Sequence, residues 1–79
     1  MNYDKVDETV LALLFLGRHQ ASKLDDVRAW KSFDWDTLDR LHKKGLISNP
    51  IGKAKSVAFT HDGLEQSGQI FHKLFETLD

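Results

Sequence analysis

The sequence contains no cysteine, so it can form neither disulfide bonds nor thiolate metal sites. Its longest apolar run, Val10–Leu16, is far too short to span a bilayer. Met1–Lys5 shows no basic segment ahead of a cleavable apolar stretch, and we therefore expect a cytoplasmic protein. The sequence also lacks internal repeats, low-complexity tracts and linkers.

What is present has the composition of a small globular domain: 79 residues, of which 41% are hydrophobic and 29% are charged. This length predicts a single domain over residues 1–79. A chain this short buries only about 60–65% of its unfolded surface, so its stability is marginal. Because disulfides and thiolate metal sites are excluded, self-association is the remaining support, and we expect a homodimer.

Charge is distributed unevenly along the chain, although the net charge is only −1. Residues 34–55 carry five basic and three acidic side chains, whereas residues 56–79 carry one basic and four acidic side chains. A positive segment is what contact with phosphates requires, but this excess is smaller than in most nucleic-acid-binding domains. The charge pattern alone leaves two interpretations open, a phosphate-binding surface and an ordinary solvated face.

The first 31 residues predict two helices. The first opens near Val6, where Asp4 or Asp7 would cap it, and its apolar residues recur with the helical period on a broad stripe. A stripe this broad is typical of a helix that is buried on more than one side, so we expect it at the centre of the core. A second, short helix is predicted from about Leu24 to Lys31.

A third helix is predicted over residues 34–45. Asp34 provides its N-cap, and the helix ends with lysines in the last turn and a glycine suited to a left-handed exit. Trp35, Leu38 and Leu41 lie on one face of this helix.

A two-stranded β-wing is predicted over residues 48–59. A short strand begins at Leu46 and must end near Pro50, because proline cannot donate to a β-ladder. Gly52 lets the chain reverse, and Ser56–Phe59 returns with alternating polar and apolar residues.

A last helix follows, capped by Thr60 or Asp62. Its aromatic and aliphatic side chains exceed what a core of this size needs. We therefore expect Phe71, Phe75 and Leu78 to form an isologous contact between two copies of the chain. The alternative is that these side chains fold back on the first helix.

One pattern joins the third helix, the wing and the last helix: Leu38-x-x-Leu41-x-x-x-Gly45-Leu46-Ile47, followed by Val57-x-Phe59-Thr60-x-x-Gly63. It resembles winged-helix proteins, especially bacterial transcription regulators of the MarR and PadR kind, and a small family of uncharacterised bacterial proteins of about eighty residues. The resemblance implies an α+β, mainly helical fold: a winged helix-turn-helix with three helices, a two-stranded β-wing and a C-terminal helix. It also implies binding of double-stranded DNA and transcription regulation through residues 34–45 and 48–59.

The candidate nucleic-acid-binding residues are the basic side chains of these segments, two flanking basic side chains and one hydroxyl: Arg28, Lys31, Thr37, Arg40, Lys43, Lys44, Lys53 and Lys55. The first turn of the third helix, which enters the major groove in DNA-binding relatives, instead carries Trp35, Asp36 and Asp39. Carboxylates are repelled by phosphates, so this turn fits a protein partner better than DNA. A winged-helix interaction module without DNA binding is therefore the alternative function.

Three aromatic residues, Trp30, Phe33 and Trp35, cluster around the turn before the third helix. They could close a small core between the second and third helices, or they could stack on a base or on a side chain of a partner.

The four histidines lack the spacing of a metal site, and no catalytic motif is present. We therefore expect no enzyme activity, no metal and no cofactor. A metal-dependent enzyme built on the histidines is the third alternative.

Overall fold

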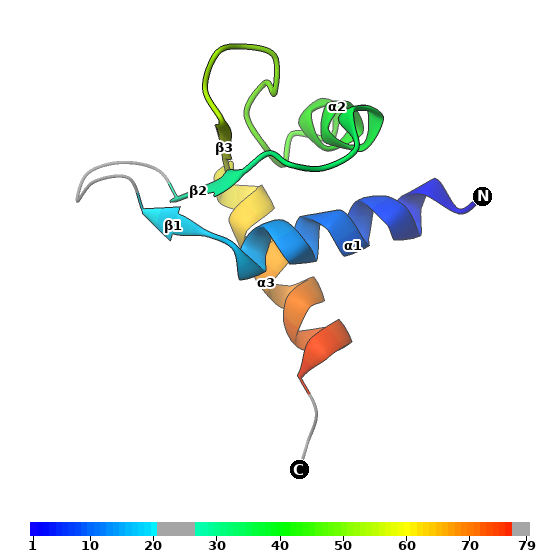
Figure 1. Cartoon of the computed structure of the whole chain (residues 1–79). Coiled ribbons are helices and arrows are strands. Elements are labelled where there is room, and N and C mark those ends of the chain that lie inside the picture. Colours follow the sequence, from blue (N-terminus) through cyan, green and yellow to red (C-terminus); the bar gives the residue numbers. More distant parts are fainter. Residues whose placement is uncertain (21–26, 77–79) are drawn as a thin grey trace.

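The computed structural model describes residues 1–20 and 27–76, which form an α+β, mainly helical fold (Figure 1). The predicted fold class is confirmed at this level. No helix within these ranges has the length and apolar character needed to cross a membrane. The elements in chain order are α1 (Tyr3–Leu16), β1 (His19–Gln20), β2 (Val27–Trp30), α2 (Trp35–Lys43), β3 (Ser56–Ala58) and α3 (His61–Phe75).

Helix α1 is the central core helix, as its apolar stripe predicts. Leu11 and Leu14 are buried in a core formed with α2, β3 and the residues that follow α2. The cap of α1 is Asn2, whose side chain accepts a hydrogen bond from the Lys5 amide at 3.1 Å. The prediction of Asp4 or Asp7 as the cap was therefore wrong.

The helix predicted over residues 24–31 is wrong where the structure describes it, because Val27–Trp30 forms strand β2. Residues 24–26 lie outside the described residues. The side chain of Ala29 is buried, whereas Trp30 points to the opposite, exposed face, which is the alternation of a half-buried strand. Four residues are too few for a periodic pattern to separate a strand from a short helix.

Strand β2 is the centre of an antiparallel sheet of order β1-β2-β3. Arg28 lies opposite His19 on one side and opposite Ala58 on the other. The prediction of a two-stranded wing was therefore wrong in its pairing, because β3 pairs with β2 and not with a strand that begins at Leu46. The strand expected from Leu46 forms only one bridge, between Ile47 and Phe59, before the chain reaches Pro50.

The predicted helices at α2 and α3 and their caps are confirmed, with Thr60 and not the alternative Asp62 as the cap of α3. Asp34 caps α2 by accepting a hydrogen bond from the Thr37 amide at 3.1 Å, and Gly45 provides the left-handed exit with φ of 77°. Thr60 caps α3 by accepting from the Gly63 amide at 2.9 Å.

Candidate nucleic-acid interface

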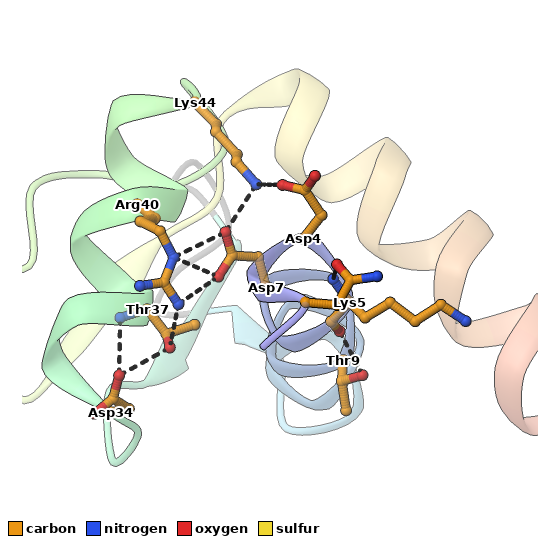
Figure 2. Close-up of polar contacts among 9 residues, drawn as sticks. Asp4, Lys5, Asp7, Thr9, Asp34, Thr37, Arg40 and Lys44 are labelled. Atoms are coloured by element: carbon orange, nitrogen blue, oxygen red, sulfur yellow. Dashed lines mark hydrogen bonds and ion pairs between the residues drawn. The ribbon is translucent and has the colours of Figure 1, made fainter.

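Asp7 joins α1 to α2 through a buried ion-pair network (Figure 2). Only 2% of Asp7 is exposed. Arg40 Nε donates to both carboxylate oxygens at 2.8 and 3.1 Å, and Arg40 Nη2 lies 2.8 Å from Oδ1. Lys44 Nζ donates to Oδ2 at 2.8 Å and lies 3.4 Å from Asp4. One buried carboxylate therefore binds two of the predicted DNA-contacting cations.

This network fixes the charge states of its members. Burial raises the pKa of Asp7, but the hydrogen bonds from Arg40 and Lys44 outweigh that effect and hold the pKa below its usual value. The hydrogen bonds with Asp7 raise the pKa of Arg40 and the pKa of Lys44. All three groups are therefore charged near neutral pH.

The other two residues of α2 that were predicted to bind nucleic acid, Lys43 and Thr37, are also engaged in contacts within the protein. Lys43 Nζ forms an ion pair with Asp39 at 2.9 Å, one turn earlier on the exposed face. The side chain of Thr37 is fully buried, where its hydroxyl lies between Asp34 and Arg40. On α2, therefore, every predicted cation lies within ion-pair distance of a carboxylate.

The predicted cations of the sheet have different partners. Arg28 Nε donates to the Ser56 hydroxyl at 2.8 Å, and its Nη2 donates to the Ser56 carbonyl at 3.0 Å. Lys31 Nζ donates to the carbonyls of Pro50 and Gly52 at 2.6 and 3.2 Å. These oxygens are neutral, so they position the two cations without cancelling their charge.

Lys53 and Lys55 are exposed in the loop of residues 48–55. This loop projects beyond the helices (Figure 1), and Lys31 ties it to the end of β2 through its side chain and through its amide, which donates to the Lys55 carbonyl at 3.0 Å. Residues 27–33 and 46–60 contain no aspartate or glutamate. We call Arg28, Lys31, Lys53 and Lys55 the basic sheet surface.

The three aromatic residues near α2 do not form a closed core. Phe33 is half-buried against the core, but 58% of Trp30 and 51% of Trp35 are exposed. Trp35 stands at the start of α2 beside the exposed Asp36 and the half-buried Asp39. The acidic first turn of α2 thus carries an aromatic side chain and lies on a different element from the basic sheet surface.

An apolar surface lies at the C-terminal ends of α1 and α3. The Phe71 ring lies 5.4 Å from the Phe15 ring and 5.3 Å from the Phe75 ring, measured between centroids. Phe75 is exposed, and so are Leu16 and Leu74 at the ends of the same two helices. We call these five residues the aromatic face. Leu78, predicted to belong to it, lies outside the described residues.

The histidines have separate environments. His19 stacks on Trp30, His42 Nδ1 lies 3.1 Å from the Ile47 carbonyl oxygen, His61 is 3.9 Å from Glu65, and His72 pairs with Glu76. Within residues 1–20 and 27–76, no three His, Asp or Glu side chains gather in a way that could hold a metal ion.

Sequence reasoning missed the role of Asp7, which decides what Arg40 and Lys44 do. A signal was available, because Asp7 lies three, four and seven residues before Val10, Leu11 and Leu14, within the apolar stripe of α1. A carboxylate at such a position must be paired when it is buried. The sequence offers no means of identifying its partners.

Comparison with known proteins places the chain in a family. Residues 2–77 match the model of the domain of unknown function DUF6429. The chain is also similar to "Uncharacterized protein y4hR" of Sinorhizobium fredii (strain NBRC 101917 / NGR234), with 49% identity over 72 residues that cover 91% of this chain and 90% of that protein. No solved structure matches the chain significantly. The chain therefore belongs to the DUF6429 family.

Proposed function

We propose that this protein binds nucleic acid through the basic sheet surface, and not through α2. The observation that carries the proposal is the contrast between the two sets of cations. Arg40, Lys43 and Lys44 are paired with carboxylates, whereas Arg28 and Lys31 contact only neutral oxygens among the described residues. Phosphates are attracted by uncompensated positive charge, so the sheet and its loop are the favoured contact.

The order of the elements supports a winged-helix relationship, in which the loop of residues 48–55 takes the place of the wing. Helix α2, the bridge at Ile47, loop 48–55, strand β3 and helix α3 follow one another in the order of a recognition helix, a wing and a last helix. Strand β2 stands where a helix-turn-helix has its first helix. We infer a winged-helix relative in which the wing has become the nucleic-acid contact, and a role in transcription regulation is the expectation that follows.

The test is fluorescence anisotropy with a labelled 20-mer, in single-stranded and duplex forms, across a series of NaCl concentrations from 50 mM upward. Four phosphate contacts predict a slope of log K against log salt of about −3.6 for the duplex and about −2.8 for the single strand. The double variant Lys53→Glu/Lys55→Glu should abolish binding. The control Lys43→Glu/Lys73→Glu makes the same change in net charge on α2 and α3 and should retain most of the affinity.

Binding of neither form at 50 mM salt, or equal losses in the two double variants, would contradict the proposal. A third variant separates the sheet from α2. Asp36→Asn/Asp39→Asn removes two carboxylates from the first turn of α2, and it should leave the affinity nearly unchanged. A large gain would place α2, and not the sheet, near the phosphates.

The aromatic face supports a second candidate function, a protein-interaction module that forms a homodimer. Almost half of Phe75 is exposed, at 47%, and its ring continues the row that begins at Phe15. Isologous pairing would cover the same patch on both copies. Phe75→Glu should convert a dimer to a monomer in light scattering, whereas Gln69→Glu, the same added charge at another exposed α3 position, should not. A monomeric mass for the unaltered protein would exclude this dimer.

A further inference from the structure

The outer face of the sheet presents an exposed indole stacked on an imidazole. The rings of Trp30 and His19 lie 5.1 Å apart between centroids, at an interplanar angle of 30°. Arg28 lies on the same face, two residues before Trp30 on β2 and directly opposite His19 on β1. Ala29 points to the other face of the sheet and is buried. Trp30 is therefore outside the core, with one side of its ring covered by His19 and most of the side chain accessible.

Core packing does not account for Trp30, because the inner face of the sheet is already filled by Ala29, Val57 and Phe59. Exposed aromatic rings beside cations are the features with which proteins bind nucleic-acid strands whose bases are unpaired. Each base offers a π-face to the ring, while the cations bind the phosphates between the bases. Within a duplex both faces of a base are already covered by its neighbours.

We propose that the occupant of this surface is a single-stranded nucleic acid, in which Trp30 stacks on a base and Arg28, Lys53 and Lys55 bind the adjoining phosphates. The inference rests on the proposed function and adds the class of strand. Arg28 is positioned for this role, since Ser56 holds its guanidinium through two hydrogen bonds on the face that carries Trp30. Charge complementarity supports this occupant, because residues 27–33 and 46–60 supply cations and no carboxylate.

The experiment compares labelled oligothymidylate of twelve residues with a mixed-sequence duplex of the same length. The unaltered protein should bind the single strand more tightly than the duplex. Trp30→Ala should weaken single-strand binding by about tenfold and leave duplex binding nearly unchanged, because base stacking is lost and phosphate contacts remain. Trp30→Phe should recover most of the affinity. Trp35→Ala, at the other exposed indole, is the matched control and should have little effect.

A spectroscopic readout separates stacking from an indirect structural role. In a Trp35→Phe background, Trp30 is the only tryptophan, and its fluorescence should be quenched when oligothymidylate binds. An oligouridylate of the same length then tells whether RNA or DNA is preferred.

The proposal is overturned if Trp30→Ala weakens both forms equally, if it has no effect, or if the fluorescence of Trp30 does not change on binding. In those cases the proposed function survives as long as Lys53→Glu/Lys55→Glu abolishes binding. Binding of neither form would instead remove the proposed function itself.

Discussion

Arg40 of α2 binds Asp7 of α1 through two nitrogens, with Nε 2.8 Å and 3.1 Å from the two carboxylate oxygens and Nη2 2.8 Å from Oδ1. The pair stabilises the packing of α1 against α2, and it also cancels the positive charge on the face of α2 that would otherwise approach phosphates. One interaction therefore explains both a structural feature of the core and the location of the proposed binding surface.

Asp7→Asn should destabilise the protein by about 2–3 kcal/mol, because the variant leaves two cations without their carboxylate. The loss stays below that of a fully buried pair, since Arg40 and Lys44 are partly hydrated. Urea unfolding measures the free energy of unfolding. Asp4→Asn is the control, and it should cost less than about 0.5 kcal/mol because Asp4 is exposed. Equal losses in the two variants would contradict the assignment of Asp7.

Acid should destabilise the protein partly through Asp7. Its pKa is lower in the folded protein than the ordinary value of 3.8, so the unfolded chain binds more protons between these two values. The stabilisation from Asp7 is thus present above about pH 4 and is lost as the pH falls through the lowered pKa. Unfolding free energies measured from pH 6 to pH 2 should fall less steeply for Asp7→Asn than for the unaltered protein. Parallel curves would contradict this prediction.

Gly63→Ala should be strongly destabilising, by at least about 2 kcal/mol, although alanine has a higher helix propensity than glycine. A Cβ at position 63 would lie 1.7 Å from the Leu46 carbonyl oxygen, and the backbone there cannot move aside as a side chain can. Gly68→Ala is the control, because its Cβ would meet only the Phe15 side chain, at 3.2 Å. Thermal unfolding compares the two, and a milder effect at position 63 than at position 68 would be inconsistent with the packing of α3 on Leu46.

Thr60→Val should cost about 1–2 kcal/mol through loss of the α3 cap. The threonine hydroxyl accepts from the Gly63 amide at 2.9 Å and donates to the Gly45 carbonyl at 2.7 Å, so it joins the end of the α2 turn to the start of α3. Thr60→Ser keeps the hydroxyl and should retain most of the stability in urea unfolding. A serine variant as unstable as the valine variant would argue against the role of the hydroxyl.

The features that were predictable from the sequence depend on neighbouring residues. Asp34 and Thr60 cap their helices by accepting hydrogen bonds from amides three residues away. Gly45 ends the α2 segment because glycine readily adopts a positive φ. Such signals act within a few residues, so they are visible in the sequence.

Strand β2 was not predictable in this way. Val27 to Trp30 suits either a short helix or a strand, and the pairing that decides the matter joins Arg28 to Ala58 and Trp30 to Ser56, far along the chain. The candidate site was likewise predictable only in part. The sequence identified the basic residues, but the pairing of Arg40 and Lys44 depends on Asp7, which lies 33 residues before Arg40.

The sequence by itself determined the cap of α2 and limited the cap of α3 to Thr60 or Asp62. It also determined the membership in a small mainly helical α+β class and the absence of carboxylates from residues 27–33 and 46–60. The tertiary structure alone decided that Arg40 and Lys44 pair with the Asp7 carboxylate, whereas Arg28 and Lys31 contact neutral oxygens within residues 1–20 and 27–76, and that Trp30 is exposed on the outer face of the sheet. The reason is that electrostatic interactions and burial depend on distances in space, which the order of residues does not specify.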